Sequence, residues 1–188
     1  KKLLRYQIMG LADLGTDTDE IVVGVSPGFG LKIFRTLAGH RLSAVLRALK
    51  AGIERGGGAM RVVRFWHTAD TSFLGLSAAR LSGSGIGIGI QSKGTAIIHQ
   101  QDRLPHNNLE LFSNAPVTAL EHYEQMGFNA TVYAKRLLPN PIVVPTKGEA
   151  LGARFHARVA LTYAIETSMI EDNASPENLK LTFLEQSA

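Results

Sequence analysis

The chain has 188 residues, 45% of them hydrophobic and 19% charged, so it is long enough to bury about two-thirds of its unfolded surface around one core. Its formal net charge of +4 is spread over basic and acidic residues that alternate, which favours a solvated surface and argues against nucleic-acid binding. The absence of cysteine excludes disulfides and thiolate metal sites, and the absence of an apolar run of roughly 20 residues argues against a membrane span.

The first predicted elements begin after a polar segment. Residues 1–20 have weak periodicity and end in GTDTDE, so we expect an N-terminal arm that leads into a single domain over residues 21–188. Residues 21–25 (IVVGV) form a short β-branched run, typical of a strand buried on both faces. A glycine loop follows at 26–30, and apolar residues recur at helical spacing from 42 to 53. This order predicts the start of an α/β unit.

The alternation continues along the chain. Strands are expected at 61–66, 86–91 and 96–100, helices at 71–81 and 117–138, a helix or long strand at 154–169, and a closing edge strand at 179–184. We therefore predict a Rossmann-like α/β sandwich with a largely parallel central sheet.

Residues 81–101 (LSGSGIGIGIQSKGTAIIHQQ) contain a single charged side chain, Lys93. In a strand, the isoleucines of 86–90 fall on one face and the glycines of 85–89 on the other. A face of nearly bare backbone needs a flat body packed against it, which is either the domain's own helix or a large planar ligand or partner subunit. Lys93, in the turn QSKG, is either solvated or bound to a phosphate or polar amide.

No complete catalytic constellation is recognisable in the sequence. The six histidines are dispersed and HExxH does not occur, although GVSPG at residues 24–28 has the spacing of GxSxG. The dinucleotide fingerprint GxGxxG is incomplete, because Ile88 stands where its third glycine is needed. A subunit that binds a cofactor for a catalytic partner is expected to have this pattern.

Residues 81–116, which run LSGSGIGIGIQSKGTAIIHQQDRLP and then NNLELFSNAP, closely resemble the medium subunit of adenosylcobalamin-dependent diol and glycerol dehydratases. That family shares the run LSGSGI-IGIQSKGT-IHQ followed by NLELF and AP. Weaker similarity includes VSPGFG, AGIERGG-AMRVVR, HTAD and FNATVYAKR, so that the resemblance extends over most of residues 20–167.

The resemblance implies a Rossmann-like subunit, inactive alone and without catalytic residues, that closes over the lower side of adenosylcobalamin. The cobalt is carried by the cofactor, with no ligand from this chain. A TIM-barrel large subunit converts a 1,2-diol or glycerol to an aldehyde and water. The implied partners are the large and small subunits, as a dimer of heterotrimers, and a reactivating chaperone. The implied location is the cytoplasm, with a bacterial microcompartment left open, since an encapsulation signal would lie in an extension before Lys1.

The resemblance also transfers candidate cofactor-binding residues. Asp70, Lys93 and Asn108 match residues of the family that bind the polar periphery of the cofactor. The family usually has Leu-Ser before that asparagine, whereas this chain has His106 and Asn107, and we expect these to give a wider, more polar wall near the lower base. Ser113, a further candidate, stands where some members have proline. The arginine of the family aligns with Gly152, and Arg154 is the candidate to replace it.

Two other interpretations remain open. The small subunit of a dehydratase-reactivating chaperone shares the fold but lacks the GSGIGIGIQSKG run. A stand-alone nucleotide-binding or cofactor-binding module would require affinity in the isolated chain, which the incomplete GxGxxG argues against.

Overall fold

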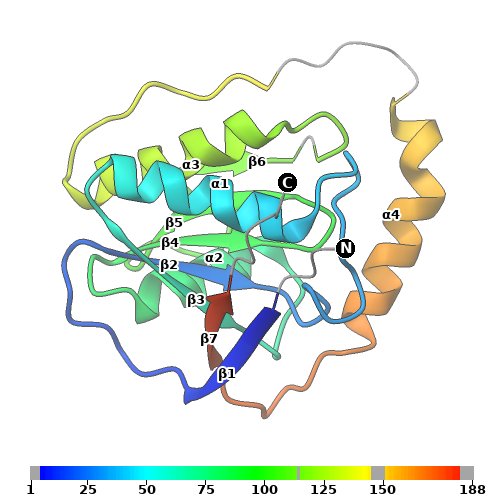
Figure 1. The fold of residues 1–188 in the computed structure, drawn as a ribbon, viewed down its shortest axis with the longest axis horizontal. Coiled ribbons are helices and arrows are strands. Elements are labelled where there is room, and N and C mark those ends of the chain that lie inside the picture. The colour runs from blue at the N-terminus through cyan, green and yellow to red at the C-terminus, as the bar shows by residue number, and fades with distance from the viewer. Residues whose placement is uncertain (1–4, 114, 145–150, 183–188) are drawn as a thin grey trace.

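The computed structural model describes residues 5–113, 115–144 and 151–182 (Figure 1). Its strands are β1 (Arg5–Leu11), β2 (Glu20–Val25), β3 (Ala59–Arg64), β4 (Ile86–Ile90), β5 (Ala96–Gln100), β6 (Glu110–Phe112) and β7 (Glu177–Thr182). Its helices are α1 (Leu42–Arg55), α2 (Thr71–Leu81), α3 (Leu120–Ala134) and α4 (Leu151–Thr167). The strands form one sheet in the order β1-β7-β3-β2-β4-β5-β6.

The sheet lies between two helical layers. α1 and α3 pack together on one face, where they bury the larger core, and α2 covers the other face against β2, β4 and β5 (Figure 1). The apolar side chains of α1 recur at Leu42, Val45, Leu46, Leu49 and Ile53, and all five are buried against this core. The predicted α/β sandwich is therefore confirmed.

The sheet is mixed rather than largely parallel. β2 runs parallel to β3 and β4, whereas β5, β6, β7 and β1 are joined by antiparallel pairing. The turn between β4 and β5 is too short for a parallel crossover and permits only a hairpin. β7 lies between β1 and β3 and is not the edge strand that the sequence predicted. The segment expected to be an arm contributes β1, which pairs with β7.

The glycine face of β4 packs against the domain's own helix. A Cβ atom added at Gly87 would lie 2.3 Å from the backbone nitrogen of Ala79, and one at Gly89 would lie 2.3 Å from the backbone nitrogen of Gly75. Both neighbours belong to α2. The bare face is thus occupied by α2, and the hypothesis that a planar ligand or partner subunit approaches it is wrong.

Glycines also bring α1 and α3 together. A Cβ atom at Gly52 would lie 1.8 Å from the carbonyl oxygen of Glu124, and one at Gly127 would lie 2.2 Å from the carbonyl oxygen of Leu49. Gly127 lowers the intrinsic helix propensity of α3 by about 1 kcal/mol relative to alanine. This cost is offset by a backbone-to-backbone approach that no larger residue permits.

α4 stands beside the sandwich and not within a layer (Figure 1). Most of its described side chains are exposed, including Leu161 at 65% and Tyr163 at 50%, whereas Glu166 in its last turn is only 2% exposed. Among the residues that the structure describes, no helix combines the length and apolar character needed to cross a membrane.

Candidate functional site

The carboxyl ends of the three parallel strands form the polar edge of the sheet. α1 follows β2 and covers one face, and α2 follows β3 and covers the other, so the connections diverge between β2 and β4. In open α/β sheets, ligands bind outside the carboxyl ends of the strands at such a switch point. Three chain segments meet at this edge: the loop after β2, the start of α2 and the turn after β4.

Asp70 begins α2 as its N-cap. Its Oδ1 accepts hydrogen bonds from the backbone nitrogens of Ser72 at 2.7 Å and Phe73 at 3.3 Å. These bonds satisfy amide groups that a helix start leaves without partners. The side chain is exposed, and Oδ2 is not used by the cap. Asp70 can therefore hold the helix with one oxygen and accept from a ligand with the other.

We expect Asp70→Ala to lower the free energy of unfolding by about 1 kcal/mol, because the cap is lost. Asp70→Asn keeps an oxygen that can accept the same bonds and should stay within about 0.5 kcal/mol of the wild type. Urea unfolding of both variants measures this difference. Equal stability of Asp70→Ala and the wild type would contradict the capping role, and Asp70→Asn is the variant with which ligand affinity is tested.

Lys93 lies in a tight turn after β4. The backbone nitrogen of Gly94 donates to the carbonyl of Gln91 at 2.9 Å, and the nitrogen of Leu37 donates to the carbonyl of Lys93 at 2.9 Å. These bonds fix the backbone of the turn from both sides. The partly exposed ammonium group has no hydrogen-bond partner within the described residues, so it is available to a phosphate or an amide oxygen.

Gln91 is a residue that the sequence reasoning missed. Its Nε2 donates to the carbonyl of Ala69, which fixes the orientation of the amide because a carbonyl only accepts. Its Oε1 is buried and has no donor among the described residues. A buried acceptor without a donor is uncommon and calls for an N–H group from a ligand or a water molecule. Its position within the matched QSKG run was the available signal.

The loop after β5 brings His106 and Asn108 to the same side as α2. The ring of His106 meets the ring of Phe73 edge to face, with 5.9 Å between centroids. Asn108 precedes Leu109, whose backbone nitrogen donates to the carbonyl of Ile98 at 2.9 Å. His106 is exposed and Asn108 is partly buried. His106 therefore lies beside the first turn of α2, whereas Asn108 lies next to a residue that pairs with the middle of β5.

Ser113 directly follows β6 and is exposed at the end of the sheet where the Lys93 turn lies, because Ala96 pairs with Phe112. The side chain of Arg154 lies outside the described residues, so its predicted role is untested. The structure thus brings Asp70, Lys93 and Ser113 to one polar edge, with His106 beside the first turn of α2. Among the described residues, no cluster of histidine, aspartate and glutamate could hold a metal ion.

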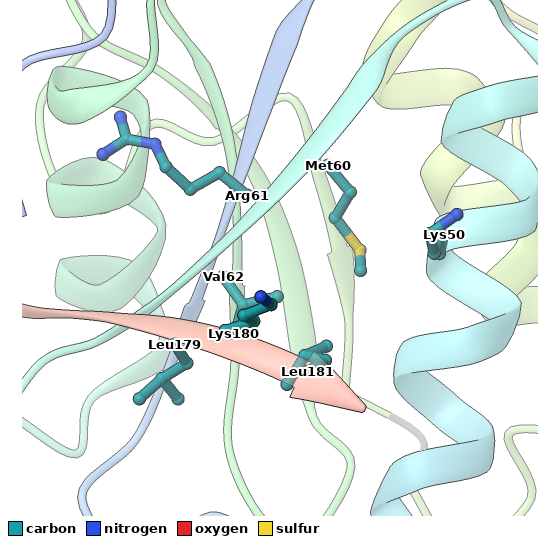
Figure 2. A pocket seen from close by; sticks show the side chains of 7 residues that line it. All are labelled: Lys50, Met60, Arg61, Val62, Leu179, Lys180 and Leu181. Atoms are coloured by element: carbon teal, nitrogen blue, oxygen red, sulfur yellow. The ribbon is translucent and has the colours of Figure 1, made fainter. Parts of the chain in front are cut away.

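Two pockets lie away from this edge. One, of about 320 Å³, is formed where β3 and β7 meet α1, with Met60, Val62, Leu179 and Leu181 as its apolar lining and Lys50 and Lys180 beside them (Figure 2). Figure 2 shows the guanidinium group of Arg61 directed away from Met60. The other, of about 480 Å³, lies at the opposite end of β4, near Gly85 and Gln101. Neither includes a predicted cofactor-binding residue.

A mixed sheet with three parallel central strands, helices on both faces and polar groups at its switch point defines an α/β protein of the kind that binds ligands at this edge. The fold is similar to that of a solved glycerol dehydratase reactivase, with 18% sequence identity, a TM-score of 0.50, and coverage of 68% of this chain and 96% of that chain. A solved diol dehydratase-reactivating factor complexed with ADP and Mg²⁺ matches at 16% identity with a TM-score of 0.46, over 67% of this chain and 95% of that chain.

The match to a sequence family identifies the chain more specifically than the similarity of its fold does. Residues 26–140, more than half of the chain, match the model of the dehydratase medium subunit family. The chain belongs to this family, which is part of a dehydratase complex. The resemblance inferred from residues 81–116 is confirmed, and family membership favours a dehydratase subunit over a reactivating chaperone.

Proposed function

We propose that the chain is the medium subunit of an adenosylcobalamin-dependent diol or glycerol dehydratase and binds the lower side of the cofactor against the large catalytic subunit. Membership of the medium subunit family is the observation that carries this proposal. The chain itself contributes no catalytic residue in this assignment. It acts in the cytoplasm, in a complex with the large and small subunits, as a dimer of heterotrimers that a chaperone reactivates.

The polar edge supports the cofactor assignment chemically. Cobalamin has a rim of amide groups and one phosphate, so it requires acceptors for N–H groups and donors for oxygens. Asp70 Oδ2 and the unsatisfied Gln91 Oε1 are acceptors, whereas the Lys93 ammonium group is a donor without a partner in the described structure. Asn108 supplies both kinds of group. The residues present fit such a ligand.

In this function the bound cofactor supplies the radical chemistry, and the chain supplies position. Lys93 and Asn108 would bind polar groups of the cofactor, and Asp70 would orient one of its amides while it caps α2. Because hydrogen bonds fix Asp70 at the start of α2 and the backbone of the Lys93 turn, these two residues are positioned before binding. Pre-organisation of this kind lowers the entropy cost of binding.

Co-expression with the large and small subunits tests the proposal. The purified complex should bind adenosylcobalamin, seen in its absorbance spectrum, and should form aldehydes from 1,2-propanediol or glycerol. Assays with several diols then define the substrate. Stable assembly with an ATPase-like chaperone subunit, and not with the large subunit, would overturn the proposal and support the reactivase.

Lys93→Ala is expected to weaken cobalamin binding to the assembled complex by about 1 to 3 kcal/mol, or roughly 5- to 150-fold, because a charge-assisted hydrogen bond is lost. Spectroscopic titration with cyanocobalamin measures the affinity independently of turnover. Lys180→Ala is the matched control, since Lys180 is exposed on β7 away from the site. An affinity of Lys93→Ala equal to that of the control would mean that Lys93 is only solvated.

A further inference from the structure

The crevice position of the fold, at the ends of β2 and β4, is filled: three hydrogen-bond donors there are directed at one oxygen. The hydroxyl groups of Ser26 and Ser92 donate to Oε1 of Glu166, and the backbone nitrogen of Ser92 donates to the same oxygen at 3.3 Å. Ser26 directly follows β2, and Ser92 lies two residues after β4. Both serines are fully buried. The strand ends therefore form a compact donor set, and a carboxylate from α4 occupies it.

The loop after β2 is shaped around this carboxylate. A Cβ atom at Gly28 would lie 3.3 Å from both Cγ and Oε1 of Glu166, closer than most side chains tolerate. Burial raises the pKa of Glu166 above its ordinary value of 4.5, and the serine bonds and the charge of Lys93 offset part of this effect. The crevice thus has the donors and the nearby cation that an anion requires.

Glu166 is the main described contact of α4 with the rest of the domain. Glu166 is the only buried side chain among those that the structure describes in this helix. It lies in the last turn, where a negative charge is unfavourable because it adds to the negative end of the helix dipole. The donors of the crevice, rather than α4 itself, therefore hold the carboxylate in this position.

We propose that this crevice is an oxyanion-binding site, occupied here by the chain's own Glu166, and that a ligand carboxylate or phosphate group competes for it. The site lies at the switch point, where open α/β sheets bind their ligands. Because the two anions use the same donors, binding of the ligand lifts the C-terminal turn of α4. The position of α4 then reports whether the site is filled. The site shares Lys93 and the switch point with the proposed cofactor-binding edge, but its donors are Ser26 and Ser92, which the cofactor assignment does not use.

Titration of Glu166→Ala with inorganic phosphate and with formate tests the site, with calorimetry as the readout. The full-length variant should bind at least one of the two anions about tenfold more tightly than the wild type, since the internal competitor is gone. A triple variant that combines Glu166→Ala with Ser26→Ala and Ser92→Ala should bind the anion about tenfold more weakly than Glu166→Ala alone, because two donors are removed. Binding of phosphate but not formate, or of formate but not phosphate, would identify the kind of oxyanion that the site accepts.

Absence of binding to a folded Glu166→Ala variant, or equal binding when the two serines are also replaced, would overturn the proposal. Should Glu166→Ala not fold, Glu166→Gln keeps the side-chain volume and removes the charge. This variant should also bind the anion more tightly than the wild type, but by a smaller factor than Glu166→Ala. An affinity of Glu166→Gln no higher than that of the wild type would count equally against the site.

Hydrogen exchange tests the displacement of α4. In the wild type, phosphate or formate at concentrations that fill the crevice should accelerate exchange of the α4 amides. The double variant Ser26→Ala/Ser92→Ala should show fast α4 exchange without any anion, because the attachment of Glu166 is lost. Unchanged α4 exchange in the double variant, or in the anion-loaded wild type, would show that Glu166 does not compete with a ligand.

Discussion

Gly87→Val is expected to destabilise the folded chain by about 3 kcal/mol or more. The new side chain would begin with a Cβ atom 2.3 Å from the backbone nitrogen of Ala79 and 2.5 Å from the carbonyl carbon of Ala78. These atoms belong to the backbone of α2, which cannot rotate away as a side chain can. α2 must therefore separate from β4, and the smaller core around Val22, Val63 and Leu74 opens with it. Urea unfolding measures the loss.

Ile88→Val is the control on the opposite face of the same strand. It removes one methyl group from the core beneath α1 and α3 and should cost about 1 kcal/mol. A comparison of the two variants separates a general sensitivity of β4 from the packing of α2 on its glycines. Wild-type stability of Gly87→Val would mean that α2 does not pack there, and a ligand or partner would again be a candidate for the glycine face.

The sequence predicted a bare face on β4 but not what covers it. Alternation of glycine and isoleucine over residues 85–90 follows from the two-residue period of a strand, and the structure confirms it. Right-handed crossover connections place α1 and α2 on opposite faces once β3 and β4 lie on opposite sides of β2. That strand order depends on contacts that local patterns do not encode.

Strand direction was predictable in one part of the sheet and not in another. The turn of a few residues between β4 and β5 permits only antiparallel pairing, so the mixed character of that half was available from the sequence. β7, by contrast, pairs with β1 from the other end of the chain and with Val62 to Arg64 of β3. Its alternating pattern fits an edge strand and an internal strand equally well.

The candidate site was predictable where a continuous motif carried it. Asp70 and Lys93 stand at strand ends and helix starts, which the local pattern located before the structure. Glu166 could not be predicted, because its contacts with Ser26 and Ser92 span 140 and 74 positions of the chain. No periodicity in α4 distinguishes Glu166 from other polar residues of a helix. Only the folded chain brings it to the switch point.

Arg64→Ala is expected to lower the free energy of unfolding by about 3 to 5 kcal/mol, because it removes a buried charged side chain from its partners. Arg64 ends β3 and is 1% exposed. Its guanidinium group donates to the carbonyl of Phe29 at 2.6 Å and lies 4.7 Å from the ring of Tyr6 and 5.5 Å from the ring of Trp66. Desolvation lowers the pKa of Arg64, and the neighbouring Tyr6 and Glu177 partly offset this.

Removal of this side chain leaves unpaired groups as well as a cavity. The carbonyl of Phe29 loses its donor, and Oε2 of Glu177 is already buried without a hydrogen-bond partner among the described residues. Arg64→Met fills most of the volume but restores no donor, so it should cost about 1 to 3 kcal/mol. The difference in destabilisation between the two variants then gives the part of the cost that comes from the cavity. If both variants stayed within about 0.5 kcal/mol of the wild type, this role of Arg64 would be contradicted.

The loss of stability in the Arg64 variants should not be spread evenly over the fold. Arg64 connects three segments that are distant in sequence: β1 through Tyr6, the loop after β2 through Phe29, and the end of β3. Most of the apolar side chains of the two cores lie on the helices and on β2 and β4, away from Arg64, so local opening should precede global unfolding. Hydrogen exchange of Arg64→Met should therefore accelerate first in β1 and the loop after β2, while amides of β4 remain protected. Because that loop carries Ser26 and Gly28, exchange at the oxyanion crevice should accelerate with it.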